Sequence, residues 1–396
     1  MLYKMEDFVL FNPTEKLKKG VLAKKISMDA LKPFTRKISF FSVEEFNGGT
    51  KFRNGDTIMA RITPCLENGK TAMVDILETE EVAFGSTEYI VLRAIPGKSD
   101  PFYLYYLFRS NFIRNVAIKS MVGSSGRQRV QIDVLKNLEI DLPDIKTQEK
   151  IGKALFSFDA AIENNNEIKE NVKKQIKALF EKTFLNPEAN QGWEKDKIGN
   201  YISLERGFSY KGKYLVESGD TAMINLGNIL PNSVFREEKL KFYSGDFSNK
   251  HIVKKGDIVV ANTDLTQDRE VLGSAVFVPE LGYKTMIASH HLSIVRNIRI
   301  SKYFLFGLLN TPVFRERVSG FATGTTVLAL PADALLNCEF KVPPVQLIEG
   351  YDEQVKPMFQ YLESIENKNK KLSKLRDELV LELITTNLQI NNKSGE

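Results

Sequence analysis

The sequence predicts an α+β protein built from two tandem homologous domains, each followed by a long helix. Two observations carry this prediction: a repeat that spans nearly the whole 396-residue chain, and two long segments that each carry a narrow apolar stripe. The length allows two or three domains with cores of their own. A hydrophobic fraction of 42% and a charged fraction of 27% are ordinary for a globular protein.

The repeat is anchored on a Gly-Asp pair that precedes an apolar run. FRNGDTIMAR at 52–61 returns as VKKGDIVVAN at 253–262, and Gly256 lies 201 positions after Gly55. A period this long exceeds the ~20 to 50 residues of solenoid repeats and indicates two homologous domains. Further blocks keep offsets between 200 and 203: STEYIVLR at 86–93 with SHHLSIVR at 289–296, and DVLKNLEIDLP at 133–143 with DALLNCEFKVP at 333–343.

Each half begins with short strands and continues into a helix. The strand segments, such as TAMVDIL and GDIVVAN, are β-branched or alternating runs bounded by Gly, Asn, Asp and Pro. A short aromatic helix is predicted at 103–116 and again at 303–318, before a Pro boundary. The predicted bounds are 1–146 for the first domain, 147–186 for the first long helix, 187–346 for the second domain and 347–390 for the second long helix.

Asp56 and Asp257 are the only repeated carboxylates in a suggestive context. A Gly-Asp pair before a strand is typical of a turn in which the Asp side chain accepts hydrogen bonds from nearby backbone N–H groups. We therefore interpret both residues as structural rather than catalytic.

In the two long segments, apolar residues recur at steps of three and four while the remaining surface is Lys, Glu, Asn and Gln. So narrow a stripe favours two helices packed against each other; the alternative is that each helix packs along its own domain. Asn165, Asn166 and Asn369 interrupt the stripe, either as buried residues that set the register or as solvated ones. The residues predicted to pair the helices are Leu155, Phe158, Ile162, Ile168, Val172, Ile176, Leu179, Met358, Leu362, Ile365, Leu372, Leu375 and Leu379.

The sequence lacks the common catalytic and cofactor-binding motifs. No G-x-x-x-x-G-K-[ST], G-x-G-x-x-G or G-x-S-x-G pattern occurs. His251, His290 and His291 are not spaced with Cys or carboxylates as zinc ligands are. Cys65 and Cys338 lie in different halves, so there is no disulfide framework. We expect no catalytic residue and no metal site in this chain.

The N-terminus and the charge give weaker indications. MLYKMEDFVL lacks a basic stretch followed by a long apolar core, and no apolar run reaches the ~18 residues of a membrane helix. Two cysteines suit a reducing compartment, so we expect a cytoplasmic protein. The net charge of +5 leans toward a polyanionic partner without identifying one.

Polar side chains gather in loops that differ between the two halves. Arg, Asn, Gln and Thr are the types that bond base edges and phosphates, and Gly-Ser or Gly-Thr turns let backbone N–H groups approach a phosphate. Ordinary solvated surface is the alternative reading of such loops. The candidate DNA-binding residues are Arg61, Thr63, Asn68, Lys70, Ser124, Ser125, Arg127, Gln128 and Arg129 in the first half, and Asn262, Thr263, Gln267, Arg269, Thr325 and Thr326 in the second.

These residues resemble the specificity subunit of type I restriction–modification enzymes. RITPCLENGK at 61–70, TDLTQ at 263–267 followed by LGSAVFVP, the Gly-Ser-Ser and Gly-Thr-Thr turns, and the boundary IDLPDIKTQEKI are similar to that family's target-recognition domains. The resemblance covers essentially the whole chain. The second boundary, VPPVQLIEGYDEQV, departs from the pattern.

The resemblance implies a non-catalytic DNA-binding subunit. Each domain would be a target-recognition domain that reads one half of an interrupted, asymmetric site in double-stranded DNA. The helices would pair as an antiparallel coiled coil, space the two halves, and dock two methyltransferase subunits, which motor-nuclease subunits would join. This chain would hold no cofactor, because S-adenosylmethionine, ATP and Mg would belong to the partner subunits.

Other functions fit the residues alone. The chain would serve equally in a related adenine-methyltransferase system that only modifies DNA. It would also suit a protein-interaction scaffold with two homologous domains that bind something other than DNA. An enzyme with its own active site is disfavoured by the missing motifs.

Overall fold

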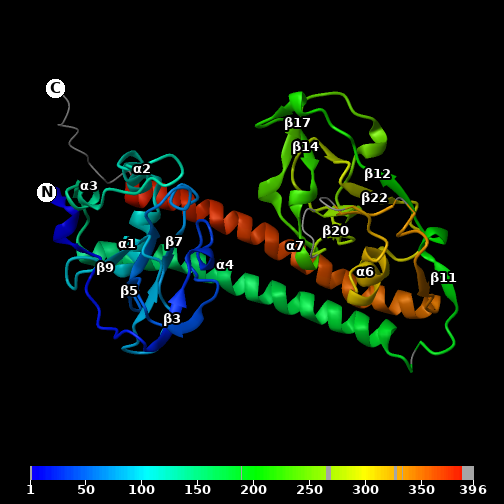
Figure 1. Ribbon diagram of the computed structural model, residues 1–396, viewed down its shortest axis with the longest axis horizontal. Coiled ribbons are helices and arrows are strands. Elements are labelled where there is room, and N and C mark those ends of the chain that lie inside the picture. Colours follow the sequence, from blue (N-terminus) through cyan, green and yellow to red (C-terminus); the bar gives the residue numbers. More distant parts are fainter. Residues whose placement is uncertain (1, 189, 265–268, 325–327, 332, 386–396) are drawn as a thin grey trace. The chain divides into compact units, whose positions relative to one another are not determined.

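The computed structural model describes residues 2–188, 190–264, 269–324, 328–331 and 333–385. It divides into two compact units: unit 1 is Met1–Ile168 with Ile365–Glu396, and unit 2 is Lys169–Ser364. Each unit therefore contains one β-rich domain and a segment of each long helix (Figure 1). The fold is α+β, as the sequence predicts.

Unit 1 contains two four-stranded sheets and a short strand pair. One sheet is antiparallel throughout, in the order β2 (Val9–Phe11), β9 (Tyr89–Ala94), β6 (Thr57–Ala60) and β7 (Thr71–Met73). The other has the order β4 (Ser42–Glu45), β3 (Leu22–Ile26), β8 (Ala83–Gly85) and β5 (Thr50–Phe52), and only its β3–β8 pair is parallel. The strand pair is β1 (Leu2–Lys4) with β10 (Glu139–Asp141).

Unit 2 repeats this arrangement. Its antiparallel sheet has the order β12 (Ser203–Arg206), β22 (Leu292–Arg296), β18 (Ile258–Ala261) and β20 (Ala275–Phe277). Its mixed sheet has the order β13 (Leu215–Val216), β17 (Lys241–Tyr243), β14 (Thr221–Ile224) and β21 (Thr285–Ala288), with β14 parallel to β21. The short pairs are β11 (Lys195–Lys197) with β24 (Glu339–Lys341), β15 (Ile229–Leu230) with β16 (Val234–Phe235), and β19 (Thr263–Asp264) with β23 (Leu328–Ala329).

The repeated Gly-Asp pair forms the same turn in both units. Gly55 and Gly256 have φ of 87° and 80°, a conformation that favours glycine. Asp56 accepts from the Arg53 N–H at 2.9 Å, and Asp257 accepts from the Lys254 N–H at 3.0 Å. These bonds confirm the interpretation of both aspartates as turn residues that start β6 and β18.

Two helices follow the sheets in each unit, where the sequence predicts one. In unit 1 they are α1 (Pro101–Arg109) and α2 (Asn111–Lys119), and in unit 2 α5 (Lys302–Leu309) and α6 (Pro312–Ser319). The break occurs because Ser110 and Thr311 act as N-caps of the second helix: their side chains accept from the backbone N–H groups of Ile113 and Phe314. Unit 1 also has the short helix α3 (Ile132–Lys136).

The long helices are α4 (Ile145–Phe180) and α7 (Val345–Val380), and each ends in a π-helical turn, η3 (Glu181–Leu185) or η10 (Leu381–Thr385). Asp144 caps α4 by accepting from the Thr147 backbone N–H at 3.0 Å and the Thr147 hydroxyl at 2.8 Å. None of the helices in the described ranges is both long and apolar enough to cross a membrane.

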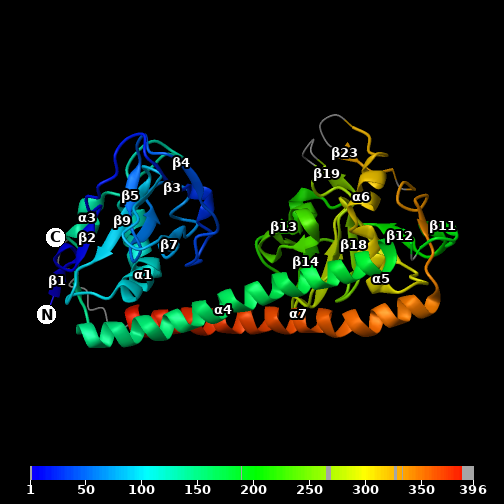
Figure 2. The same ribbon diagram turned by 90° about the horizontal axis from the view of Figure 1, so that it is seen from below.

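In unit 1 the two helices lie side by side (Figure 2), and polar side chains join them. The Asn165 amide donates to the Asn369 side-chain oxygen at 2.7 Å, and the Asn369 amide donates to Asn166 at 3.0 Å. Nearer the start of α4, Asp159 pairs with Arg376 of α7. Because lower residue numbers in α4 meet higher numbers in α7, the helices are antiparallel. Asn165 and Asn369 are buried, which answers the question that the sequence leaves open.

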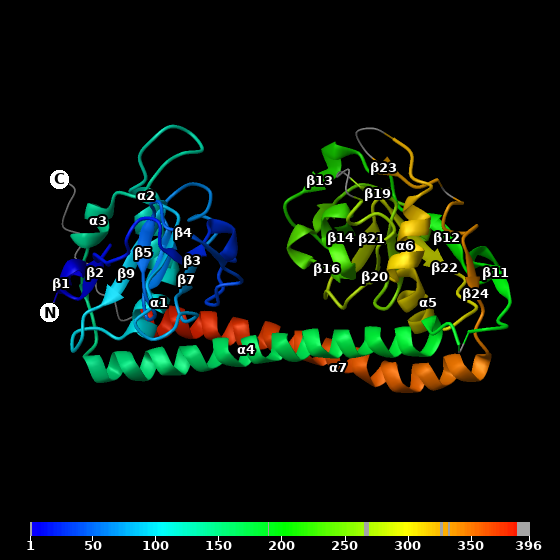
Figure 3. The ribbon, with the colours of Figure 1, turned by 60° about the horizontal axis from the view of Figure 1, so that its bottom comes forward.

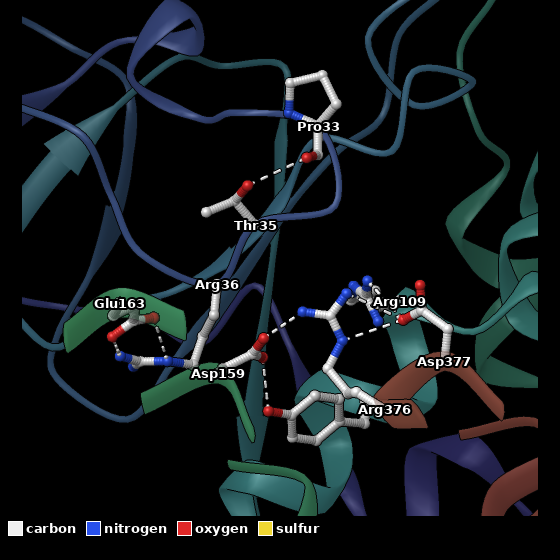
Figure 4. Close-up of polar contacts among 9 residues, drawn as sticks. Pro33, Thr35, Arg36, Arg109, Asp159, Glu163, Arg376 and Asp377 are labelled. Carbon is white, nitrogen blue, oxygen red and sulfur yellow. Dashed lines mark hydrogen bonds and ion pairs between the residues drawn. The ribbon is translucent and has the colours of Figure 1, made fainter. Parts of the chain in front are cut away.

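The same polar network joins the helices to the domain of unit 1. The Tyr106 hydroxyl of α1 donates to Asp159 at 2.6 Å, and Arg109 of α1 donates to Asp377 at 3.0 Å. Arg36 approaches from the other side and donates to Glu163 of α4 at 2.6 and 3.1 Å (Figure 4). Each charged group in this buried region therefore has a partner of opposite sign, as low-dielectric surroundings require.

In unit 2 the helices contact each other through aromatic rings. Phe180 and Phe184, at the end of α4, lie 5.8 and 5.1 Å from Tyr351 of α7, measured between ring centroids. The Phe184 ring also lies 4.8 Å from Phe304 of α5. Gly307 leaves room for Phe180, since a Cβ there would lie 2.3 Å from the Phe180 ring. The contact between the two helices is therefore apolar in unit 2, whereas in unit 1 it is charged.

One predicted pairing residue is wrong. Leu375 is 49% exposed, whereas its neighbour Arg376 is buried. The stripe advances by four and three residues from Ile365, and the position that faces inward carries a charged side chain satisfied by Asp159 and Asp377. Of the other predicted residues, Leu155, Ile176 and Ile365 are buried, and Phe158, Ile162, Ile168, Val172, Leu179, Met358, Leu362, Leu372 and Leu379 are half-buried.

The Gly-Asp turns predict different sensitivities in the two units. Asp56 is 1% exposed and accepts two bonds from Arg93 at 2.6 and 2.7 Å, while Asp257 is 27% exposed and accepts one from Arg296 at 2.9 Å. Asp56→Ala removes one of the two carboxylates that pair with the largely buried Arg93 and leaves only Glu15, at 2.6 Å, so we expect it to lower the free energy of unfolding of unit 1 by about 2 kcal/mol. Asp257→Ala should cost about 1 kcal/mol. Urea unfolding of both variants checks this, and equal losses would contradict it.

Candidate nucleic-acid interface

Three segments of unit 1 converge beyond the end of β6. The Arg61 N–H donates to the Glu88 carbonyl at 2.9 Å, and the Val130 N–H donates to the Arg61 carbonyl at 2.9 Å. The Thr63 N–H donates to the Gln128 carbonyl at 3.0 Å. Loops 61–70 and 121–130, which are separate in the sequence, therefore form one surface around the turn that ends at Glu88.

Unit 2 builds the same frame. The Asn262 N–H donates to the His291 carbonyl at 2.8 Å, and the Leu330 N–H donates to the Asn262 carbonyl at 2.8 Å. Beside these bonds, β19 pairs with β23, Thr263 facing Ala329. In unit 2 these strands lie on the side away from α7, and in unit 1 the segment between α2 and α3 extends away from α4 (Figure 3).

The frames coincide, but the side chains they present differ. At three positions that match between the two frames, unit 1 carries two cations and a carboxylate, and unit 2 carries an amide, an imidazole and a methyl group. These positions are Arg61, Glu88 and Arg129 in unit 1, and Asn262, His291 and Ala329 in unit 2.

In unit 1 the centre of this surface is an ion pair. Arg129 donates to both carboxylate oxygens of Glu88, through Nε at 3.0 Å to each oxygen and through Nη2 at 2.6 Å to Oε1. The two side chains remain 43% and 23% exposed. The nearby Arg61 is half-buried, and its Nε has no hydrogen-bond partner.

The Gly-Ser-Ser turn projects beside this pair. Gly123 has φ of 135°, and residues 123–127 are exposed, including the predicted Ser124, Ser125 and Arg127. The Arg127 N–H closes the turn by donating to the Ser124 carbonyl at 3.0 Å. This loop therefore offers hydroxyls and a cation to solvent.

Other predicted residues of unit 1 divide between surface and interior. Asn68 is exposed. The Thr63 hydroxyl donates to Glu67 at 3.2 Å, next to the Gln128 backbone. Lys70 is turned inward, where its ammonium donates to the Met28 carbonyl at 2.8 Å, so the structure gives this cation a role in holding the loop.

In unit 2, Asn262 is half-buried and Thr263 is buried, with its hydroxyl 2.9 Å from His291 Nδ1. Arg269 is exposed, and its Nη1 donates to the Ser319 carbonyl of α6 at 3.1 Å. Three predicted residues, Gln267, Thr325 and Thr326, lie outside the residues that the structure describes.

Two adjacent imidazoles border the frame of unit 2. The His290 and His291 ring centroids lie 3.9 Å apart. Burial lowers the pKa of His290, with Arg206 adding to the effect. The pKa of His291 is lowered by burial and by the neighbouring His290, Arg206 and Lys241. Both shifts favour the neutral form, in which each imidazole offers one donor and one acceptor.

A pocket of about 530 Å³ opens beside His290. Its wall includes Arg206, Phe208, Lys250 and His251, and Lys250 pairs with Glu205 at 2.8 Å. Cations and aromatic rings in one pocket suit a nucleic-acid backbone or base. Among the residues the structure describes, no group of three or more His, Cys, Asp or Glu could hold a metal ion.

Sequence reasoning missed Glu88, His290 and Arg206 as parts of this surface. A signal for the first was present: the repeat replaces Glu88 by His291, a change of charge inside an otherwise matched strand block. No comparable signal marks Arg206, because its place beside His290 arises only when β12 pairs with β22.

The two imidazoles predict a pH dependence of the stability of unit 2. Their pKa values are lower folded than unfolded, so the unfolded chain takes up protons first as the pH falls. The contribution of the neutral imidazoles to the free energy of unfolding is complete above their pKa in the unfolded chain, about 6.5, and is lost as the pH falls below that value. Thermal unfolding between pH 7.5 and 5.5 should show this loss. The double variant His290→Gln with His291→Gln should flatten it; an unchanged slope would contradict the prediction.

Known proteins resemble this chain in sequence. Residues 13–174 match the family model described as type I restriction modification DNA specificity domain. The MjaVIII specificity subunit of Methanocaldococcus jannaschii is 24% identical over 311 residues, which cover 72% of this chain and 71% of that one. The EcoAI specificity subunit of Escherichia coli is 37% identical over 105 residues, which cover 26% of this chain and 18% of the other.

A solved structure shares the fold. The type I restriction–modification S subunit from M. genitalium is 17% identical, with a TM-score of 0.57, and the match covers 97% of this chain and 95% of that one. The tandem domains, the antiparallel helix pair and the sequence matches lead to one conclusion. This chain is similar to type I restriction–modification specificity subunits over most of its length, and its residues 13–174 match the model of a type I restriction modification DNA specificity domain.

Proposed function

We propose that this chain is the non-catalytic DNA reader of a type I restriction–modification complex, in which unit 1 reads one half of an interrupted asymmetric site and unit 2 reads the other. The observation that carries the proposal is the shared backbone frame, which has different side chains at its three matched positions in the two units. One fold used twice, with different hydrogen-bonding groups in the same place, suits the reading of two different sequences.

The chemistry of both surfaces supports DNA as the ligand. Arg127 and Arg269 are exposed cations at the rims of the two frames, suited to phosphates. Amide, imidazole and guanidinium groups lie nearer the frames and carry the paired donors and acceptors that distinguish base edges. The candidate contacts are thus divided between positioning on the backbone and reading of bases.

The helices would set the spacing and bind the partners. Segments of α4 and α7 belong to both units, so the helix pair links the two readers. Large apolar side chains on α7 are exposed, among them Val345 at 63% and Tyr361 at 49%. Such groups support docking of two methyltransferase subunits, which motor-nuclease subunits would join. S-adenosylmethionine, ATP and Mg would be bound by those partners, where methyl transfer and cleavage would occur.

Half-site reading has a direct test. Asn68→Ala, in unit 1, and Asn262→Ala, in unit 2, are compared in the complex with its methyltransferase subunits. Loss of a base contact costs ~1 to 3 kcal/mol at one base pair, so each variant should relax one position by about 10- to 100-fold. We expect the relaxed positions to lie in opposite halves of the methylated motif, mapped by single-molecule sequencing. A motif without two separated parts would overturn the proposed function.

The spacing role predicts a defined change in the motif. Seven residues inserted in α4 after Asn166 and seven in α7 before Asn369 preserve the 3.5-residue repeat of the seam on both helices. The arm lengthens by ~10 Å, about three base pairs at ~3.4 Å each. We expect the spacer between half-sites to grow by about three base pairs while the half-sites stay the same. Insertion in α4 alone is the control, since it breaks the register and should abolish methylation; an unchanged spacer in the double insertion contradicts the role.

A further inference from the structure

We propose that Arg129 reads a guanine in the half-site of unit 1, and that Glu88 is the positioning residue that holds its guanidinium in place. This inference rests on the proposed function and adds to it the base class and the residues for one position. It is carried by the bidentate Glu88–Arg129 pair at the centre of the unit 1 frame.

Glu88 is itself held rigidly. Its backbone carbonyl accepts from the Arg61 N–H at 2.9 Å, and its own N–H donates to the Ser86 hydroxyl at 3.1 Å. The next residue, Tyr89, is buried and begins β9 in the central sheet. A carboxylate anchored this way transmits the position of the sheet to Arg129, which otherwise sits at the end of an exposed loop.

The pair leaves part of the guanidinium free to read a base. An arginine has five N–H donors. Arg129 uses its Nε and one Nη2 donor on Glu88, and one Nη1 donor on the Arg127 carbonyl at 3.3 Å. One donor remains on each of Nη1 and Nη2, at the far end of the group. Two parallel donors match the O6 and N7 acceptors of guanine in the major groove.

Charge favours a base over a phosphate as the ligand. Glu88 neutralises Arg129 and would repel a phosphate brought to the same place. Hydrogen bonding to an uncharged base edge keeps its geometry and meets no such repulsion. Arg127, two residues away, is exposed, and its side chain has no ion-pair partner within the described part of the chain, so it suits the phosphate role.

Unit 2 lacks this reader. Ala329 takes the place of Arg129, and His291 takes the place of Glu88. Neither can present a bidentate guanidinium. The requirement for guanine at this point of the frame should therefore be confined to the half-site of unit 1.

The test compares Arg129→Ala, Glu88→Ala and Glu88→Gln in the complex with its methyltransferase subunits, with Arg127→Ala as the matched control. Methylated motifs are mapped by single-molecule sequencing, and DNA affinity is measured across a salt series. Arg129→Ala should relax one G·C position of one half-site by about 10- to 100-fold. Glu88→Ala should relax that same position, and Glu88→Gln should do so less, because an amide oxygen still accepts from Arg129. Arg127→Ala should leave the methylated motif intact. It should lower the DNA affinity and reduce the slope of log affinity against log salt concentration by about one.

Three outcomes would overturn the inference. The first is an unchanged motif in Arg129→Ala with a smaller salt slope, which would make Arg129 a phosphate ligand. The second is relaxation by Arg129→Ala alone, which would remove Glu88 from the reading. The third is a uniform loss of methylation in Glu88→Ala with the motif kept, which would make the pair a loop support. In all three the wild-type complex still yields a two-part motif, so failure here differs from failure of the proposed function.

Discussion

Neither domain completes its core without segments of the long helices. In unit 1, Val380 and Ile384 of the C-terminal helix are buried in the same cluster as Leu104 and Leu107 of α1. In unit 2, Phe180 and the other aromatic rings at the end of α4 fill the corresponding place. The stability of each domain is therefore tied to the helix pair, and a change in the helices reaches the domains through packed side chains rather than through a flexible linker.

The seam between the helices combines apolar packing with groups that are costly to bury. Asn165 and Asn369 satisfy each other, and Asp159 is satisfied by Arg376 and by Tyr106 of the domain. A purely apolar seam would be more stable, but it would tolerate sliding by a turn. A shifted register would leave these polar groups unpaired at several kcal/mol. The polar contacts thus select one alignment of the two helices.

Two copies of one fold allow one chain to carry two chemistries. The turns at Gly55 and Gly256, and the backbone bonds from Arg61 and Asn262, are the same in both units. Backbone geometry positions a loop, whereas side chains decide which base edges it can bond. Because the frame is carried by backbone atoms, the side chains on it can change from Glu88 and Arg129 to His291 and Ala329 without loss of the fold.

The sequence by itself determined the two-domain repeat, the paired helices and the structural Gly-Asp turns, because these follow from spacing, periodicity and local backbone preference. Only the tertiary structure decided which polar residues act together. Glu88 faces Arg129, and Lys70 turns inward, because strands far apart in the chain pair beside them. Likewise Arg376, not Leu375, occupies the seam, since a buried position takes a charge once Asp159 and Asp377 lie beside it. Local patterns record which residues are apolar, whereas the partner that makes a polar residue tolerable is a matter of contact in space.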